Sequence, residues 1–368
     1  MAVYKIFPTQ DATLYSIAPE MNTGLDEILE ASLEVGALTD PAPQASRFLI
    51  QFSSDDINDV ISNKILENAW QSNLRCFIAD VTALNANTTL EIYPVSQSWN
   101  MGTGKYLNSP QTQNGCSWIW RDYQGGTPWT TSSFAADSTG SYSASVDPGG
   151  GTWYTNYSSS QQFDYYSDKD INVNVTDIVS QWFSSSISND GFIIKQQTEF
   201  IDNENVQPKI KYFSIDTHTI YPPCLEFKWD DYTFNTGSST NTILTVNPFT
   251  VTIGDNPGYF YSGSINKFRV YSRPEYPART FITSSYYTQN YYLPTDSYYA
   301  IKDLDTNEYV VDFDSTYTKL SADATSSYFT LYMNGLQPER YYKILIQTTI
   351  DGSTVVLDND YNFKILNG

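Results

Sequence analysis

The side chains that most often perform chemistry in proteins are scarce in this chain of 368 residues. It has a single histidine, His218, which stands between two threonines. Catalytic triads, histidine-based metal sites and general bases that need a second histidine are therefore absent or nearly so. Because no serine or cysteine in a known nucleophile context accompanies it, we interpret His218 as a connector residue.

Carboxylates are the other candidates, since the chain carries 41 Asp and Glu residues. A glycosidase needs two of them, and pairs such as Asp55-Asp56 and Asp230-Asp231 are available. Nothing in their spacing separates these pairs from solvated surface acids, and no D-x-D-x-D-G calcium loop is present. The stretch Thr103 to Lys105 lacks the first glycine of a phosphate loop. We therefore expect no enzyme activity, no cofactor and no required metal.

The three cysteines, Cys76, Cys116 and Cys224, are odd in number and far apart in the sequence. This pattern does not resemble a disulfide framework. We expect all three to be free thiols that pack as small apolar side chains.

Charge and composition exclude several classes of partner. The formal net charge of -21 argues against nucleic acid and anionic membranes, which both attract an excess of cations. No run is long enough to span a membrane, and the first residues lack a basic segment followed by an apolar one. We expect synthesis and retention in a cytoplasm. Thirty tyrosines and only 17% charged residues are typical of an all-β protein.

The stretch from Asp170 to Phe213 shows how such a chain is built. Residues 171–175 alternate apolar and polar side chains, which predicts a strand. A helix then starts at Thr176, whose hydroxyl we expect to cap it. The helix carries one apolar stripe, formed by Ile178, Val179, Trp182 and Phe183. A helix this short cannot bury a tryptophan alone, so we expect Trp182 to anchor it on a sheet.

The rest of the sheet follows from the same two-residue period. Alternation predicts strands at 3–7, 12–15, 47–52, 74–81, 89–95, 192–195, 209–213, 225–234, 243–253, 309–313, 328–332, 341–348 and 354–357. A second helix, capped by Ser54, is predicted over 54–69. The sequence thus predicts an all-β fold with two short helices.

The motifs of the first half resemble the DNRLRE-type β-sandwich module. V-T-D-I-V-x-x-W at Val175 is followed by N-D-G-F-I-I and by Q-P-K-I-K-Y, and Asp11-Ala12-Thr13, Met21 to Gly24, Ile28 to Glu30 and Ser98-Trp99 carry the earlier signals. The resemblance covers 1–215 and implies a β-sandwich there. Residues 216–257 read as a connector and a strand pair. Residues 258–368 are expected to form a second sandwich, because 328–347 resembles the turn and strand of immunoglobulin or fibronectin domains.

Five of the eight tryptophans lie in the aperiodic region between Trp99 and Tyr157. Exposed aromatic rings on such loops could stack on sugars, which makes a glycan-binding surface one interpretation. Its candidate contact residues are Trp118, Trp120, Trp129 and Trp153. The other interpretation is that these side chains cover the edges of the sandwich.

Residues 285–300 repeat a tyrosine pair three times. The pairs are Tyr286-Tyr287, Tyr291-Tyr292 and Tyr298-Tyr299. Adjacent residues of a strand point to opposite faces, and tyrosine suits protein interfaces. We predict an interface here, with register set by the basic side chains of Arg269, Arg273 and Arg279. Alternatively, the tyrosines are buried in their own domain and the basic residues are solvated.

Taken whole, the chain resembles virion structural proteins of contractile-tailed phages that infect marine cyanobacteria. The resemblance is carried by the first sixteen residues and by the stretches Ile265 to Arg269 and Lys302 to Asp305. It implies an architectural or attachment component of the tail, baseplate or neck, made in the host cytoplasm, located in the virion, and bound to other virion proteins and copies of itself. The alternative is an adhesin-like carbohydrate-binding module that recognises a host surface glycan.

Overall fold

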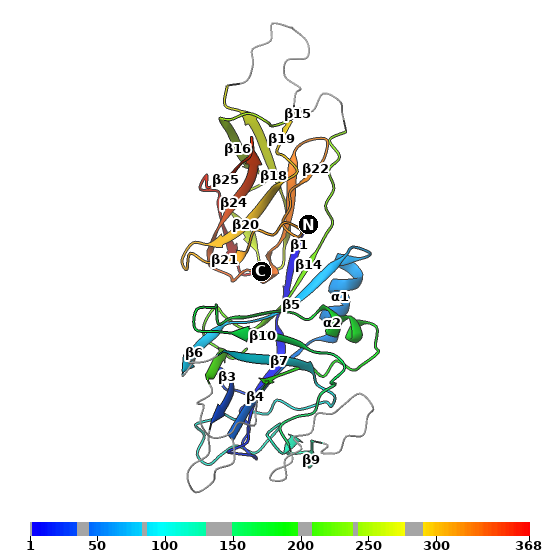
Figure 1. Ribbon diagram of the computed structural model, residues 1–368, viewed down its shortest axis with the longest axis vertical. Coiled ribbons are helices and arrows are strands. Elements are labelled where there is room, and N and C mark those ends of the chain that lie inside the picture. The colour runs from blue at the N-terminus through cyan, green and yellow to red at the C-terminus, as the bar shows by residue number, and fades with distance from the viewer. Residues whose placement is uncertain are drawn as a thin grey trace. The chain divides into compact units, whose positions relative to one another are not determined.

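The computed structural model describes residues 2–34, 44–82, 87–129, 149–197, 208–237, 242–276 and 290–368. Strands dominate these residues, which confirms the predicted all-β class (Figure 1). The helices are α1 (Ser54–Asp59) with a π-helical turn (Val60–Ile65), α2 (Thr176–Phe183) and a 3-10 turn (Met333–Gly335). In the described part of the chain, no helix has the length and apolar character to cross a membrane.

The chain forms two compact units, and each unit consists of separate stretches of the sequence. Unit 1 consists of Met1–Lys5, Ile65–Trp70 and Phe227–Gly368. Unit 2 consists of Ile6–Lys64 and Gln71–Glu226. The boundaries expected from sequence, after residues 215 and 257, differ from these, because the segment 216–257 is divided between the units at Phe227.

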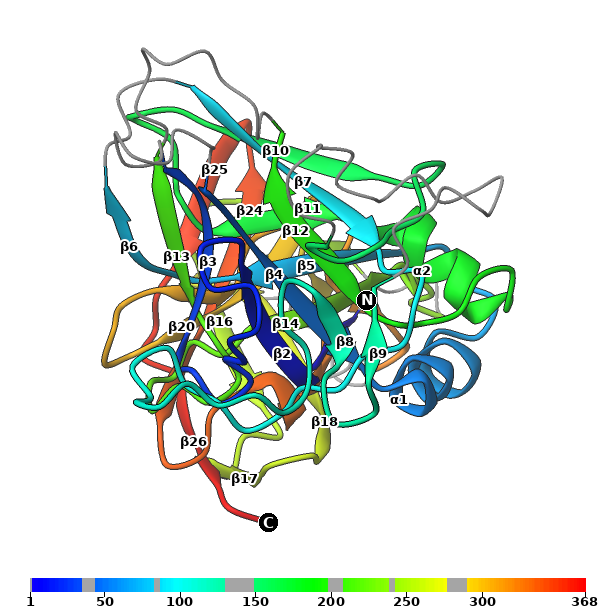
Figure 2. The ribbon, with the colours of Figure 1, turned by 90° about the horizontal axis from the view of Figure 1, so that it is seen from below.

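Unit 2 is built on a sheet whose strand order is β10-β7-β12-β4-β3-β13-β6, with β2 also paired to β4 (Figure 2). Their bounds are β2 (Pro8–Tyr15), β3 (Ile28–Glu34), β4 (Gln44–Phe52), β6 (Ile78–Thr82), β7 (Thr88–Pro94), β10 (Ser159–Phe163), β12 (Phe192–Gln196) and β13 (Lys209–Phe213). A second pairing joins β5 (Trp70–Cys76) to β11 (Ile171–Asn174), and a small hairpin joins β8 (Trp120–Asp122) to β9 (Thr127–Pro128).

Both helices of unit 2 differ at their ends from the sequence prediction. Thr176 is the first residue of α2 rather than its cap, and its hydroxyl accepts a hydrogen bond from the Ser72 amide at 2.9 Å. Phe183 is the last helical residue and is 40% exposed, so it leaves the apolar stripe. In α1 the cap is Ser53, whose hydroxyl accepts from the Asp56 amide, and not Ser54.

Unit 1 contains two six-stranded sheets packed around one core. The first has the order β15-β19-β18-β23-β22, with β16 paired to β18, and the second has the order β17-β26-β24-β20-β21, with β25 paired to β24. Side chains of both sheets meet in one cluster, where Phe268 stacks on Phe329 and Phe329 stacks on Tyr299. This is a sandwich held by aromatic packing.

The strands of the first sheet are β15 (Thr242–Ile243), β16 (Phe249–Gly254), β18 (Ile265–Pro274), β19 (Tyr291–Tyr292), β22 (Ser321–Ala322) and β23 (Ser327–Tyr332). Those of the second are β17 (Tyr259–Tyr261), β20 (Ser297–Asp303), β21 (Tyr309–Val311), β24 (Tyr341–Ile350), β25 (Ser353–Leu357) and β26 (Asn362–Leu366). The remaining strands are β1 (Ala2–Ile6) and β14 (Cys224–Trp229).

Candidate interaction face

The second sheet of unit 1 turns alternate side chains to opposite sides. On one side, Tyr299, Ile301, Ile344, Ile346 and Phe363 are buried in the core of the sandwich. The residues between them point away from that core. Ala300 and Leu345 lie on the outward side and are buried, so only the exposed residues of that side are available to a partner.

Tyrosines dominate the outward side. We call Tyr259, Tyr261, Tyr298, Tyr309 and Tyr341 the tyrosine face. Four of them are exposed, at 53% (Tyr259), 52% (Tyr261), 41% (Tyr309) and 50% (Tyr341), and Tyr298 is half-buried. Single exposed aromatic residues are ordinary, but four exposed tyrosines on one side of one sheet form a surface that favours a partner.

Strand register places these tyrosines in rows across the sheet. Tyr259 lies opposite Lys364, and Lys364 lies opposite Tyr341. In the next row Lys302 lies opposite both Lys343 and Tyr309. Because hydrogen-bonded strands fix these positions, the tyrosines are displayed on a rigid support.

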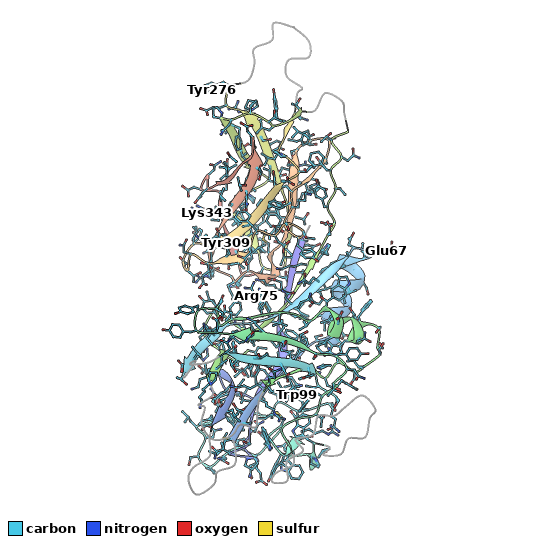
Figure 3. The ribbon with its side chains drawn as sticks, viewed as in Figure 1. Glu67, Arg75, Trp99, Tyr276, Tyr309 and Lys343 are labelled. Atoms are coloured by element: carbon cyan, nitrogen blue, oxygen red, sulfur yellow. The ribbon has the colours of Figure 1, made fainter. Side chains whose placement is uncertain are left out.

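Lysines are interleaved with the tyrosines. The Lys302 amine lies 5.4 Å from the centre of the Tyr309 ring, and the Lys364 amine lies 5.7 Å from that of Tyr341. Both distances are within the range of cation–π attraction. Figure 3 labels Tyr309 and Lys343 on this sheet.

The charges of Lys343 and Lys364 are balanced by carboxylates. Lys343 forms ion pairs with Asp358 at 3.1 Å and Asp360 at 2.8 Å. The hydrogen bonds to Asp360 and Asp358 raise the pKa of Lys343 above its usual value, so the amine stays charged. The tyrosine face thus has tyrosines on the edge strands β17 and β21 and lysines on the strands between them. It combines aromatic rings with paired charges, and both occur in protein interfaces.

The tyrosine pairs predicted from sequence as an interface are divided by the structure. Tyr292 and Tyr299 are fully buried in unit 1, which corrects the prediction for both. Tyr299 stacks on Phe329 with ring centres 4.2 Å apart, and the Tyr292 hydroxyl donates to the Asp323 carbonyl at 2.9 Å. Tyr291 is half-buried against the core, and Tyr298 alone joins the tyrosine face. Tyr286, Tyr287 and Arg279 lie outside the described residues.

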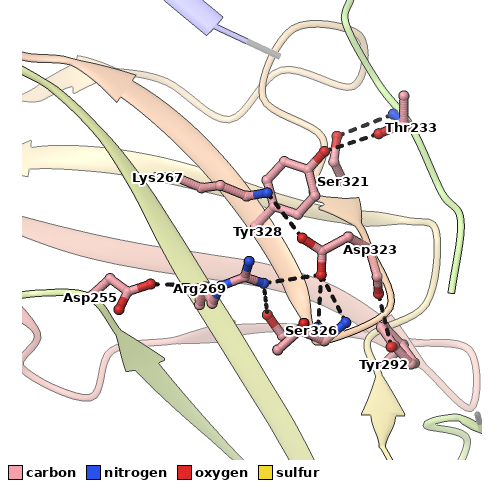
Figure 4. A network of polar contacts seen from close by, with 10 residues as sticks. Thr233, Asp255, Lys267, Arg269, Tyr292, Ser321, Asp323, Ser326 and Tyr328 are labelled. Atoms are coloured by element: carbon pink, nitrogen blue, oxygen red, sulfur yellow. Dashed lines mark hydrogen bonds and ion pairs between the residues drawn. The ribbon is translucent and has the colours of Figure 1, made fainter.

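The two predicted basic residues that the structure describes lie on β18, in the other sheet. Arg273 is exposed and lies opposite Thr250 of β16. Arg269 forms ion pairs with Asp323 at 3.0 Å and with Asp255 at 3.7 Å, and the Lys267 amine also reaches Asp323 at 3.0 Å (Figure 4).

These ion pairs hold a turn of the domain itself. Burial alone would raise the pKa of Asp323, but hydrogen bonds from Arg269, the Thr325 amide and Lys267 hold it well below its usual range. Arg269 is therefore already neutralised within its own unit. This corrects the prediction that it is available to set the register of a partner.

The tryptophans proposed as a glycan platform lie inside unit 2. Trp118 is fully buried, Trp129 is 2% exposed and Trp153 is 8% exposed. Trp120 is half-buried and packs edge-on against Tyr123. Three of the four rings cannot stack on a sugar, and the structure corrects the glycan-contact prediction for them.

Two of the buried rings, those of Trp118 and Trp153, enclose a charged side chain. The guanidinium of Arg47 lies 4.9 Å from the centre of the Trp118 ring and 5.1 Å from that of Trp153. It also donates to the Gly150 carbonyl at 2.6 Å. Trp99, labelled in Figure 3, belongs to the same core and donates its indole N–H to the Asp190 carbonyl.

The other chemical candidates are dispersed. The His218 side chain is 90% exposed and lies 3.8 Å from Glu27, and Asp55 and Asp56 are exposed in the first turn of α1. Among the described residues, no group of three or more His, Cys, Asp or Glu side chains could hold a metal ion. Cys76, Cys116 and Cys224 are buried thiols that form no disulfide, as the sequence predicted.

Comparisons with known proteins add little. No family model matches the sequence, and no curated protein matches it. A DUF4785 family protein from Legionella pneumophila is 10% identical, with a TM-score of 0.16, over 82% of this chain and 65% of that protein. A β-glucuronidase from Parabacteroides merdae is 9% identical, with a TM-score of 0.16, over 96% of this chain and 36% of the enzyme. A structure of the same enzyme with glycerol in its active site is 10% identical, with a TM-score of 0.17, over 98% of this chain and 35% of the enzyme. Overlaps this weak establish neither a shared fold nor a shared function.

Proposed function

We propose that this chain is an architectural protein that works through protein–protein contacts in a larger assembly. Its sequence resemblance to virion structural proteins of contractile-tailed phages makes the tail, baseplate or neck the assembly we propose. The observation that carries the proposal is the tyrosine face of unit 1.

The physical case rests on the chemistry of tyrosine on a rigid sheet. A tyrosine ring supplies a large apolar area with few rotatable bonds, and its hydroxyl can still bond a partner. Anchors of this kind carry most of the binding energy in many protein interfaces. The ion pairs of this face, such as Lys343 with Asp358, would contribute orientation more than affinity.

The glycan-binding alternative has lost its proposed contact surface. It relied on exposed tryptophans in the loops after Trp99, and Trp118, Trp129 and Trp153 are core residues. Trp120, which is half-buried, offers a single ring. We therefore favour the architectural role.

Hydroxyl-radical footprinting on the free chain and on the assembled particle tests this proposal. Tyr259 and Tyr341 should become protected in the particle, whereas Tyr165 and Tyr166, which are 73% and 92% exposed in unit 2, serve as the reference pair. The double variant Tyr259→Ser, Tyr341→Ser should assemble at least tenfold less well than Tyr165→Ser, Tyr166→Ser. Equal labelling of Tyr259 and Tyr341 in the two states, with both variants assembling normally, would exclude this face.

A further inference from the structure

A cavity of about 480 Å³ lies in unit 2, beside the two helices. Its wall comes from the first turn of α1, the end of α2, the loop that leads to β12, and one residue from the segment before β10. The lining residues are Ser54, Ile57, Asn58, Tyr154, Trp182, Ser185, Ser186, Ile187, Ser188 and Asn189. The volume is within the range of small-molecule sites.

Hydrogen bonds hold the walls of this cavity in place. The Asn189 amide nitrogen donates to the Phe52 carbonyl at 2.9 Å and to the Ser54 hydroxyl at 3.1 Å. Gln51 donates to the Asn189 carbonyl at 2.8 Å. The loop is thus fixed to α1 and β4, and a ligand would not have to order it.

The lining combines an apolar base with a polar margin. Ile57 is 1% exposed and Trp182 is 6% exposed, so both belong to the core as well as to the cavity. The other lining residues are four serines, two asparagines, Tyr154 and Ile187. The amide hydrogens of Asn189 are already bonded within the wall, so the remaining polar groups are the ones open to a ligand. Hydroxyls and amides both donate and accept hydrogen bonds. A sugar ring has the matching chemistry, with hydroxyls that donate and accept and C–H groups that pack on apolar side chains.

Charge narrows the ligand class further. None of the ten lining residues is an acid or a base. The flanking charges are carboxylates, because Asp55 and Asp56 stand in the first turn of α1 and Asp190 accepts a hydrogen bond from Ser188. Phosphate and other anions would meet repulsion, and a cation would find no carboxylate in the wall itself.

We propose that this cavity binds one or two units of a neutral saccharide. The site is separate from the buried tryptophans Trp118, Trp129 and Trp153, and it does not depend on the tyrosine face of unit 1. An architectural protein can carry such a site, so either proposal can fail without the other.

Titration of the full chain with neutral sugars, followed by calorimetry and by saturation-transfer NMR, tests this inference. The panel should contain glucose, galactose, mannose, xylose, N-acetylglucosamine and their β-linked disaccharides, with glucuronate and glucosamine as the charged counterparts. At least one neutral sugar should bind, and the matching charged sugar should bind at least tenfold more weakly.

Two variants should block the cavity without touching the core. Asn58 and Ser186 are exposed lining residues, so Asn58→Trp and Ser186→Trp should keep the melting temperature and weaken sugar binding at least tenfold. Ser62→Trp is the matched control, because Ser62 is exposed on the adjoining helical turn and is not part of the lining. The inference is overturned if no neutral sugar binds, if glucuronate binds equally well, or if folded Asn58→Trp and Ser186→Trp bind as tightly as Ser62→Trp.

Discussion

The indole ring of Trp182 packs against the ring of Phe192, with their centres 4.6 Å apart. The first residue lies on α2 and the second on β12, the next strand in sequence. This contact fastens the helix to the eight-stranded sheet of unit 2. It also explains why a helix of eight residues persists, since packing rather than propensity stabilises short helices.

We predict that Trp182→Ala lowers the free energy of unfolding of the folded chain by about 3 to 5 kcal/mol, the usual cost of deleting a buried aromatic side chain. Chemical denaturation measures it. Phe183→Ala is the control, because Phe183 is the next residue and is 40% exposed. Its effect should stay within about 1 kcal/mol. Similar losses in the two variants would contradict the assigned role of Trp182.

The sequence predicted this part of the fold well because its signals are local. Residues 171–175 alternate and residues 176–183 carry one apolar stripe, and both periods survive in β11 and α2. The helix caps were misplaced by one residue. Both Ser53 and Ser54 can cap α1, and the Ser54 hydroxyl is engaged by Asn189, a residue distant in sequence. In the same way, the Thr176 hydroxyl at the start of α2 is engaged by the distant Ser72 amide.

The candidate face could not be predicted, because it is assembled from distant strands. Tyr259 and Tyr341 are 82 positions apart, and the register with Lys364 brings them into one row. The Tyr-Phe-Tyr pattern of β17 is the one local signal of this face, since it places two tyrosines on the side opposite the buried Phe260. Alternation predicts that adjacent residues such as Tyr298 and Tyr299 face opposite sides of the sheet. It does not predict which side is covered by the rest of the protein.

Of the two interpretations of the tryptophan loops, the structure favours burial for Trp118, Trp129 and Trp153. A region without periodicity can still be buried when its side chains enclose a group from elsewhere, here Arg47 of β4 between Trp118 and Trp153. No residue near Trp118 in the sequence indicates that Arg47 packs against it. The lack of periodicity alone therefore could not decide between exposed and buried rings.

Arg47 should matter to stability more than a surface arginine does. It is 1% exposed and donates to the Gly150 carbonyl from between two indole rings. Arg47→Met should cost about 1 to 3 kcal/mol, because it removes a hydrogen bond from a charged group and the attraction to the rings. Arg121→Met is the control, since Arg121 bonds Ser98 near the surface. Equal unfolding free energies for the two variants would show that the indole enclosure contributes nothing.

The three cysteines should be chemically silent in the folded protein. Cys76, Cys116 and Cys224 are buried free thiols, and burial raises the pKa of Cys76 and of Cys116. The thiolate is the reactive form, so both depletion of thiolate and lack of access protect them. A thiol-specific chromogenic reagent should find no reactive group in the native chain and three after denaturation without reductant. Fewer than three after denaturation would reveal a disulfide.

Asp11 on β2 is a buried carboxyl with an incomplete set of partners. It is 1% exposed, and one of its oxygens accepts a hydrogen bond from the Ile215 amide at 2.7 Å. The other oxygen has no hydrogen-bond partner among the residues that the structure describes. Burial raises the pKa of Asp11 to about 8. The Ile215 amide opposes this, and the carboxylates of Asp216 and Asp26 add to it.

This pKa predicts a pH dependence of stability with a definite sign. Between about pH 4 and pH 8 the Asp11 carboxyl is protonated in the folded chain and ionised in the unfolded chain, so the folded state binds more protons. The free energy of unfolding should therefore fall as pH rises through this window, by up to about 1.4 kcal/mol per pH unit from this group, and level off above it. Asp11→Asn keeps the shape and has no charge to gain, so it should flatten the decline and be more stable than the parent chain near pH 8.

Asp80→Asn, at an exposed position on β6, controls for the loss of one acid from a chain at -21. Denaturant titrations at pH 5, 6, 7 and 8 decide the matter, and parallel slopes for Asp11→Asn and the parent chain would show that Asp11 is ionised in the folded state.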